Sequence, residues 1–446
     1  MRFNALLVRR SYILRMVQPA VSPLSPYLQA DTADPATDAL DPIDRILDAV
    51  RNHLGMEIAF ASRIADGKRE FTHLRADCPV PVSVGDAEPL EQTLCQLVLD
   101  GVLPALMHDA SQHEAALPMP ITLGLPVGSH LNVPLRLSDG SIYGTFCCVN
   151  RQPDWSLTER DMGTLRAFAE LASHLIEHEL CETRQRAAIS ERIGEVLVSE
   201  GITIVHQPIH DLLSGTPIGV ECLARFSDCS ERGPDCWFAE AGEVGLAIEL
   251  ELMAVRSALQ TLRHVPAPCY VAINVSPATV ISGKLASLIE GIPAGRLVIE
   301  VTEHDQVSDY AQLRAALQPL RRHARIAIDD VGAGYAGLRH LVDLQPDILK
   351  LDMSLTRDIG SDPARKALAH ALVHFAQAIG CSLVAEGVET EAERRTLAEL
   401  RVQFAQGYLF SHPMPVIAAQ QLLLGRTEPD LATGLDLPKA AISRCA

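Results

Sequence analysis

Short apolar segments separated by longer amphipathic stretches recur along the chain from residue 201 onward. Such alternation is typical of βα units, in which helices connect parallel strands. Eight units of this kind within about 210 residues predict a closed barrel. The predicted strands are Ile202–Ile209, Ile218–Leu223, Tyr270–Val275, Leu297–Val301, Arg325–Asp330, Ile348–Asp352, Ser382–Ala385 and Ala405–Phe410.

The first connection in this series is too short to contain a helix. The segment Asp211–Thr216 includes Ser214-Gly215, a pair typical of hairpin turns. Parallel neighbours need a long crossover, so the first two strands are expected to run antiparallel. Residues 201–425 therefore predict an α/β fold, a modified TIM barrel with an antiparallel first strand.

The fifth predicted strand ends in two adjacent carboxylates, Asp329 and Asp330, before a Gly-rich turn. Neighbouring carboxylates repel, so at a buried strand end they are costly unless a cation neutralises them. Two divalent ions would suit the pair, with one side chain bridging the ions and the other binding the second. Taken alone, the pair is equally compatible with a turn that caps the next helix.

Six other predicted strands carry an oxygen donor or a lysine at or near their ends. These residues are Glu221, Asn274, Glu300 with Glu303, Lys350 with Asp352, Glu386 with Glu389, and Gln406. Each one alone has an ordinary explanation, such as a surface acid, a turn former or a helix start. In a barrel, however, these strand ends converge on one mouth, where active sites of this fold lie.

The donors are hard oxygens without His or Cys, a set that favours Mg²⁺ or Mn²⁺ over zinc. Two such ions suit in-line displacement at phosphorus, because one activates water and the other stabilises the leaving oxygen. The residue types at the predicted mouth therefore indicate a two-metal phosphoryl chemistry.

The same residues carry a resemblance to a known family. In order, the motifs are Gln207-Pro208-Ile209, Glu221-Cys222-Leu223-Ala224-Arg225, Asn274-Val275-Ser276-Pro277, Glu300-Val301-Thr302-Glu303, Asp329-Asp330, Lys350-Leu351-Asp352, Ala385-Glu386-Gly387-Val388-Glu389 and Gln406-Gly407-Tyr408. Over residues 190–425 the chain resembles the EAL family of cyclic di-GMP phosphodiesterases. This resemblance implies hydrolysis of one phosphodiester of cyclic di-GMP to linear pGpG, with two Mg²⁺ or Mn²⁺ ions.

The resemblance also implies roles for individual residues. The first ion would be held by Glu221, Asn274, Glu300 and Asp329, and the second by Asp329, Asp330 and Glu386. Lys350 would position the attacking water, Glu303 would fix the loop after Asp330, and Glu386 is also a candidate general base. Glu389 joins the implied catalytic set, and the implied substrate-binding residues are Gln207, Leu223, Arg225, Asp352 and Gln406.

Two features depart from the family pattern. Cys222 replaces the Ala of the signature, and the loop over residues 330–337 has lost a Phe and three hydroxyls. The rate and its regulation are therefore open, and three readings remain. The chain is an active phosphodiesterase, a non-hydrolysing cyclic di-GMP receptor, or a barrel metalloenzyme that acts on another phosphate or enolisable substrate. The sequence contains no Gly-Gly-[Asp/Glu]-Glu-Phe stretch of a partner cyclase domain.

Residues 41–180 predict a compact α+β module. Its expected elements are Asp41–Leu54, Glu57–Ile64, Arg69–Leu74, Leu90–Leu103, Val127–Leu137, Ser141–Val149 and a long helix that continues to about Glu200. The module resembles GAF sensor domains through Gly128–Leu135, Tyr143–Cys148 and the helix around Gln92–Cys95. That resemblance specifies a fold and leaves open whether the signal is a small ligand or a redox change.

The eleven cysteines form no CxxC pair and no metal-ligand spacing. An odd number of scattered thiols is typical of a reducing cytosol, which predicts a cytoplasmic protein. The adjacent Cys147 and Cys148 could attach a chromophore or respond to oxidation. They are equally consistent with thiols buried in a strand.

The remaining segments predict the domain organisation. Residues 1–40 indicate a disordered leader and residues 426–446 a tail, while residues 181–200 indicate a helical linker. The linker either transmits a signal between the protomers of a homodimer or is a passive spacer. Arg9-Arg10 interrupts any apolar core of a signal peptide, and Met16 is an alternative start.

The net charge of −18 disfavours a partner such as duplex nucleic acid, which needs a basic surface. The sequence also contains no apolar run near the roughly 20 residues that a membrane-spanning helix requires. Neither nucleic acid nor a membrane is therefore expected as a partner.

Overall fold

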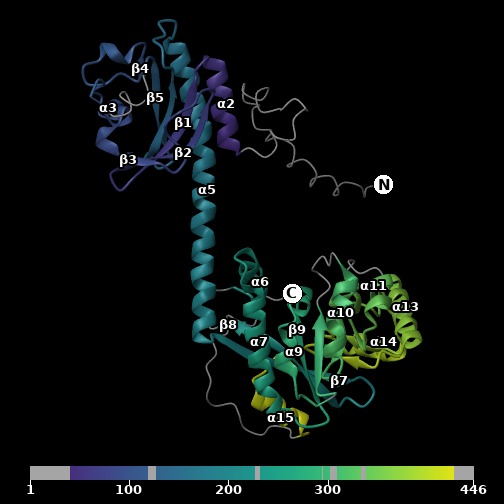
Figure 1. The fold of residues 1–446 in the computed structure, drawn as a ribbon. Coiled ribbons are helices and arrows are strands. Elements are labelled where there is room, and N and C mark those ends of the chain that lie inside the picture. The colour runs from purple at the N-terminus through teal and green to yellow at the C-terminus, as the bar shows by residue number, and fades with distance from the viewer. Residues whose placement is uncertain are drawn as a thin grey trace, which may run out of the picture. The chain divides into compact units, whose positions relative to one another are not determined.

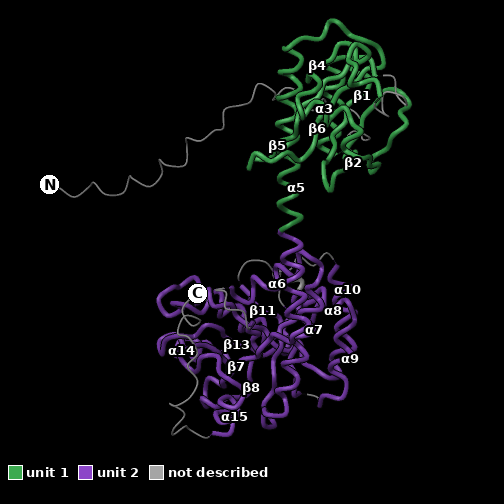
Figure 2. The backbone as a smooth tube through the Cα atoms, turned by 90° about the vertical axis from the view of Figure 1, so that its left-hand side faces the viewer, with its two compact units in different colours: residues 1–184 green, residues 185–446 purple. Residues whose placement is uncertain are grey.

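The computed structural model describes residues 41–118, 127–226, 232–293, 295–301, 309–332 and 338–425. The chain divides into two compact units, residues 1–184 and residues 185–446 (Figure 2). Helix α5, Glu159–Ser199, begins in the first unit and ends in the second, as the sequence predicts for the long helix. The predicted leader and tail and Glu303 lie outside the described residues.

The first unit is built on an antiparallel sheet with the strand order β3-β2-β1-β6-β5-β4 (Figure 1). Its strands are β1 Ile58–Ala65, β2 Lys68–Ala76, β3 Ala87–Pro89, β4 Leu106–Met107, β5 His130–Arg136 and β6 Ile142–Val149. Its helices are α2 Pro42–Leu54, η1 Leu90–Gln92, α3 Leu94–Leu99, η2 Ala110–Gln112 and the first part of α5. This arrangement confirms the predicted α+β module.

Both faces of this sheet are covered by apolar cores. One core contains Cys148 together with residues of α2 and α5, and the other contains Cys147 together with residues of α3. Successive residues of a strand point to opposite faces, so the two adjacent cysteines belong to different cores.

The prediction of one continuous helix over Leu90–Leu103 is wrong. The segment breaks at Thr93, which has an extended backbone and accepts a hydrogen bond from the Gln96 amide. A threonine that accepts this bond starts a new helix instead of continuing the old one. The break places Cys95 in the first turn of α3.

The second unit is a closed barrel with the strand order β10-β11-β12-β13-β14-β7-β8-β9. Strand β7 runs antiparallel to both of its neighbours, β14 and β8, and the other described pairs are parallel, which confirms the predicted modified TIM barrel. The strands are β7 Ile202–Asp211, β8 Pro217–Phe226, β9 Tyr270–Val275, β10 Leu297–Val301, β11 Arg325–Val331, β12 Ile348–Leu351, β13 Ser382–Ala385 and β14 Phe404–Ala405.

Helices surround this barrel (Figure 1). They are α6 Pro234–Glu243, α7 Ala247–Thr261, η3 Leu262–His264, α8 Pro277–Ile281, α9 Leu285–Ile289, α10 Tyr310–Leu320, α11 Leu338–Leu344, α12 Met353–Thr356, α13 Pro363–Ile379, α14 Glu391–Glu399 and α15 Val416–Leu423. A large core lies between strands and helices, and a smaller one contains inward residues such as Ile209, Tyr270 and Val384. Residues Ile189 and Ile193 of α5 pack with Trp237 of α6 in a further cluster.

Several strand limits differ from the prediction, and these differences matter for the site. Strand β8 continues to Phe226 because it forms a long hairpin with β7, so Glu221 lies in mid-strand. Strand β12 ends at Leu351, and Asp352 instead caps α12 by accepting a hydrogen bond from the Ser354 amide. The predicted strand Ile348–Asp352 is therefore wrong at its end, and Lys350 and Asp352 do not lie on one strand face. Strand β14 ends at Ala405, so Gln406 follows it directly.

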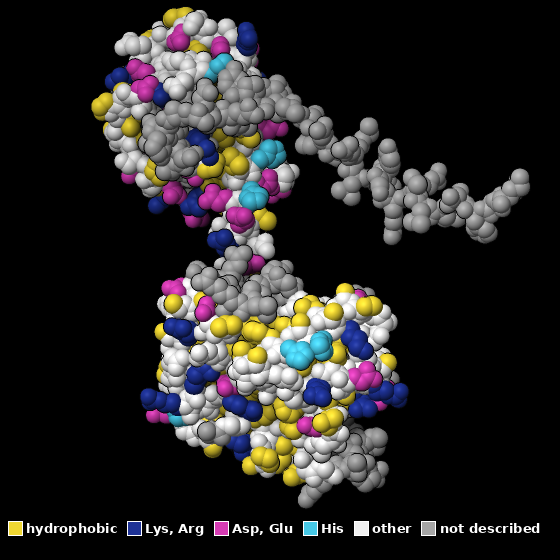
Figure 3. Space-filling model, turned by 90° about the vertical axis from the view of Figure 1, so that its right-hand side faces the viewer, with side chains coloured by type: hydrophobic (Ala, Val, Ile, Leu, Met, Phe, Trp, Pro, Cys, Tyr) yellow, Lys and Arg dark blue, Asp and Glu magenta, His cyan; other side chains and the backbone are white. Residues whose placement is uncertain are grey.

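On the face shown in Figure 3, basic, acidic and apolar side chains of the second unit are interspersed. Within the described residues, none of the helices combines the length and the apolar character that crossing a membrane would require.

Candidate active site

A single ammonium group lies among four carboxylates at the mouth of the barrel. Lys350, the third residue of β12, is 1% exposed, and its Nζ lies 2.6 Å from Glu386, 2.8 Å from Glu300, 3.1 Å from Asp329 and 3.5 Å from Glu221. These partners come from β8, β10 and β11 and from the segment after β13. Four of the carboxylates expected at the mouth thus converge on Lys350.

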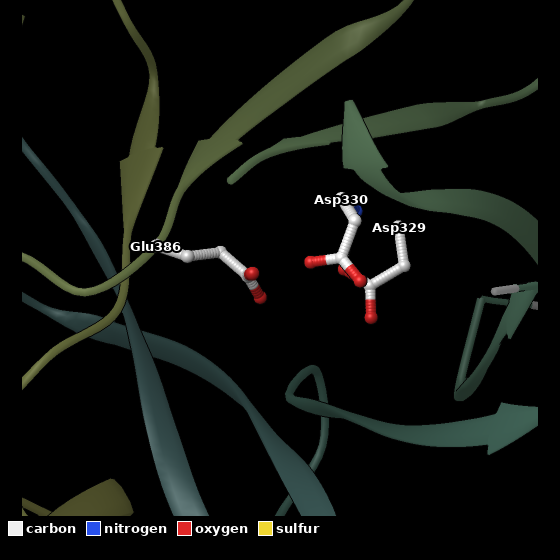
Figure 4. Close-up of side chains that lie close together, drawn as sticks. All are labelled: Asp329, Asp330 and Glu386. Carbon is white, nitrogen blue, oxygen red and sulfur yellow. The ribbon is translucent and has the colours of Figure 1, made fainter. Parts of the chain in front are cut away.

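A bulge explains how two adjacent aspartates serve one site. In a regular strand, Asp329 and Asp330 would point to opposite faces. The pairing of β11 with β12 shifts its register between Ile328 and Val331, and Asp330 has a φ of 55°. Asp tolerates this left-handed conformation better than most residues. Both carboxylates consequently lie on the side of Glu386, as Figure 4 shows.

Two amide side chains fix the orientation of Glu221, and a third amide holds one of them. Asn274 donates from Nδ2 to one carboxylate oxygen at 2.7 Å, and Gln406 donates from Nε2 to the other at 2.6 Å. Gln406 also donates to Gln207 Oε1 at 3.0 Å, which ties the residue after β14 to β7. The sequence motifs contain these amides, but they do not reveal that Gln406 bonds to both Glu221 and Gln207.

The charges in this cluster are unevenly distributed. Although burial opposes ionisation, Lys350 together with Asn274 and Gln406 lowers the pKa of Glu221. Burial raises the pKa of Glu300 and of Glu386 well above the usual range, and the neighbouring carboxylates add to this effect. Burial also opposes the charge of Lys350, but the four carboxylates raise its pKa. One ammonium therefore does not neutralise four carboxylates, and additional positive charge would relieve the repulsion.

The donor set fits a divalent cation. Carboxylate oxygens of Asp329, Asp330 and Glu386 lie within 4.8 Å of one another (Figure 4). Asn274 uses its amide nitrogen on Glu221, and among the described residues no donor meets its buried Oδ1. An oxygen left in this way beside carboxylates is a suitable ligand for a hard cation.

Comparison with known families decides the assignment of this barrel. The family model described as the EAL domain matches residues 188–413, slightly more than half of the chain. This chain belongs to the EAL domain family. A second model, described as a GAF domain, matches residues 37–177.

Two curated relatives each match slightly more than half of this chain. The probable cyclic di-GMP phosphodiesterase PdeD of Escherichia coli K12 is 31% identical over 257 residues, covering 55% of this chain and 48% of its own length. The cyclic di-GMP phosphodiesterase NbdA of Pseudomonas aeruginosa is 30% identical over 257 residues, covering 55% of this chain and 33% of its own. This chain therefore spans less than half the length of either relative.

A solved structure extends the likeness in fold beyond the EAL unit. The EAL enzyme Bd1971, in its form bound to cAMP and cyclic di-GMP, matches with a TM-score of 0.52. The match covers 82% of this chain and 93% of that chain at 19% identity, and so supports the fold alone.

Other EAL motif residues lie outside the contacts of Lys350. Arg225 donates from Nη1 to its neighbour's carbonyl at 2.7 Å, and the half-buried Leu223 pairs with Val205. The exposed carboxylate of Glu389 pairs with Arg357 at 3.2 Å. The printed contacts of Glu389 thus do not include the four carboxylates of the mouth.

Proposed function

We propose that this protein is a GAF-regulated phosphodiesterase that hydrolyses cyclic di-GMP to linear pGpG. The observation that carries the proposal is the contact of Lys350 with Glu221, Glu300, Asp329 and Glu386 at the mouth of an EAL barrel. The names of the two curated relatives, a probable cyclic di-GMP phosphodiesterase and a cyclic di-GMP phosphodiesterase, support the choice of substrate.

Two Mg²⁺ or Mn²⁺ ions are the proposed cofactors. Glu221, Asn274, Glu300 and Asp329 would hold the first ion, and Asp329, Asp330 and Glu386 the second. When bound, such ions supply an activated water and stabilise the charge on the leaving oxygen. The orphaned Asn274 Oδ1 and the excess of carboxylates over ammonium groups support this assignment.

The protein's own residues prepare this chemistry in three ways. Lys350 offsets negative charge beside the reacting phosphodiester and helps to position water. Glu386, whose oxygen lies nearest the ammonium, can accept the proton that water loses. Asn274 and Gln406 hold both oxygens of Glu221 in fixed positions, so that little reorganisation is needed when substrate binds.

Regulation is assigned to the GAF unit, with α5 as the element that carries the signal in a homodimer. Residues 181–188 of α5 are exposed all around the helix, whereas Ile176 before them and Ile189 after them are buried. A helix that is exposed on all sides in its middle is typical of a solvent-bridging connector between domains. In the proposed homodimer, this exposed part is open to a second copy.

The proposal is tested by incubating the full-length protein with cyclic di-GMP and Mg²⁺ or Mn²⁺, and by separating pGpG chromatographically. Glu221→Ala and Asp329→Asn should each abolish product formation while the protein stays folded, because each removes a charged oxygen donor. The matched control is Glu399→Gln, which removes a surface carboxylate that pairs with Lys366 at 3.6 Å. This control should keep the wild-type rate.

Calcium as the only divalent ion should give no product, because Ca²⁺ prefers longer bonds and more ligands than Mg²⁺. Near-wild-type turnover of either site variant at saturating Mg²⁺ would overturn the metal assignment. Cyclic di-GMP that binds tightly but stays intact would instead identify a receptor.

A further inference from the structure

A pair of buried cysteines with a buried arginine lies inside the GAF unit, apart from the EAL site. Cys95 of α3 and Cys147 of β6 are both 0% exposed, and their sulfur atoms lie 3.6 Å apart. A disulfide needs a separation of about 2.05 Å, so a movement of about 1.5 Å would join them. Cys95 lies in the first turn of the short helix α3, so a shift of α3 toward β6 would close this gap.

Arg69 of β2 supplies the charge that a reactive thiolate needs. Its Nη1 lies 3.0 Å from Cys95 Sγ, and its guanidinium also pairs with Glu88 of β3. The guanidinium is 1% exposed and lies 4.4 Å from the centre of the Phe71 ring. A cation held beside a sulfur in an apolar core stabilises the thiolate strongly, because little solvent screens the interaction.

The electrostatics distinguish the two sulfur atoms. The pKa of Cys95 is lowered to about 5, because Cys147 hydrogen-bonds to it and Arg69 lies beside it, which together outweigh burial. Burial raises the pKa of Cys147 well above its usual range, so Cys147 keeps its proton. The adjacent Cys148, on the other face of the sheet, has its pKa raised to about 12 by burial.

We infer that Cys95 and Cys147 form an oxidisable dithiol that reacts with small hydroperoxides, with Cys95 as the attacking sulfur and Cys147 as the resolving one. Arg69 donates a hydrogen bond to Cys95, and the described structure shows no such bond from Arg69 to Cys147 or Cys148, which assigns the attacking role to Cys95. This inference concerns the GAF unit and does not depend on the activity proposed for the EAL unit.

The reaction balances with hydrogen peroxide as the oxidant. The Cys95 thiolate attacks one peroxide oxygen, an S–O bond forms, the O–O bond breaks, and the hydroxide that leaves takes up a proton as water. Cys95 is then a sulfenic acid. The Cys147 sulfur attacks the Cys95 sulfur, an S–S bond forms, the S–O bond breaks, and the departing hydroxide takes the Cys147 proton as a second water.

The test treats the full-length protein with hydrogen peroxide, removes the oxidant with catalase, and unfolds the protein in acid with an alkylating agent. Non-reducing peptide mapping by mass spectrometry should find Cys95 linked to Cys147 in the wild type. This measurement needs no variant, and it separates the pair from the exposed Cys181 and Cys236. Cys147→Ser should leave a sulfenic acid on Cys95 that dimedone traps, and Cys95→Ser should leave Cys147 unmodified.

Two further variants test the assigned roles. Cys148→Ser, the matched control, should form the same disulfide as the wild type. Arg69→Lys should react faster than Arg69→Gln, and the latter should lose about tenfold or more in rate as the thiolate fraction at pH 7 falls. Free Cys95 and Cys147 in a sample whose exposed cysteines are oxidised would overturn the inference. So would a Cys95 oxidised to the sulfinic acid in the wild type without a link to Cys147.

Discussion

Lys350 is buried at the barrel mouth with its Nζ between 2.6 and 3.5 Å from four carboxylate oxygens. Replacement by Met would keep most of the side-chain volume and remove the only ammonium that the described structure places in contact with these four groups. Removing one partner from a buried ion pair typically costs about 3–5 kcal/mol, because the other charge is left uncompensated. The Lys350 ammonium is also expected to stabilise the negative charge that develops on the phosphodiester during hydrolysis.

We therefore expect Lys350→Met to lower pGpG production by about 100-fold or more, as for other preorganised charge-stabilising groups. Added Mg²⁺ should raise the thermal midpoint of this variant more than that of the wild type, since the ions would supply the missing positive charge. The matched control is Lys366→Met, which breaks only a surface pair. An equal response to Mg²⁺ in variant and wild type would show that Lys350 does not share its carboxylates with metal ions.

For individual residues, the sequence predicts the chemical type of the site better than the contacts within it. Residues such as Glu221 and Asn274 are recognisable because hard oxygen donors follow one another at predicted strands. The bulge at Asp329 and Asp330 could not be predicted, because it arises from pairing with β12. The contact of Arg69 with Cys95 could not be predicted either, since it joins strand β2 to helix α3 between residues 26 positions apart in the sequence.

Among the elements, the turn after β13 places Glu386 and depends on a close approach. Gly387 has a φ of +60°, and a Cβ atom there would lie 2.6 Å from the Cβ of Met353, the first residue of α12. No side chain fits without moving α12 or the turn. Gly380, at the end of α13, has a similar φ of +74° with no atom within 4 Å of such a Cβ.

Gly387→Ala is expected to destabilise the EAL unit by about 1–3 kcal/mol through backbone strain and the clash. It should also lower turnover, because Glu386 would shift relative to Lys350. Gly380→Ala, the matched control, carries the backbone strain without the clash and should keep the wild-type rate. The turnover of both variants is measured directly, and their free energies of unfolding are measured by chemical denaturation. Equal turnover in the two would mean that the packing of Gly387 on α12 does not position Glu386.

The element boundaries show which physical signals a sequence carries. Strands β9, β10 and β13 begin and end where apolar periodicity predicts. The limits of β12 and β14 differ from the prediction, because a local helix cap takes the residue after β12 and tertiary hydrogen bonds take the residue after β14. Asp352 caps α12, and Gln406 reaches back to Glu221 and Gln207. The Thr93 break was missed because a capping threonine looks like any polar residue within an amphipathic pattern.

For the whole molecule, the α+β class of the first unit and the α/β class of the second follow from a change in the sequence pattern near residue 201. From there on, predicted strands alternate regularly with predicted helices. The role of α5 in joining sensor and barrel rests on both proposals made above. Residues 181–188 are exposed, so a substitution there removes no core contact. Ala188, the last of them, directly precedes the buried Ile189.

Proline within a helix removes a hydrogen bond and clashes with the preceding turn. If oxidation of Cys95 and Cys147 alters hydrolysis through α5, peroxide treatment should change the rate of pGpG formation in the wild type and in Ala188→Ser. In Ala188→Pro, the ratio of the rates with and without treatment should approach one, while the mapped disulfide still forms. Cys95→Ser controls for oxidation elsewhere in the chain. A peroxide response of equal size in Ala188→Pro and Ala188→Ser would show that an intact α5 is not the route by which the GAF unit acts on the barrel.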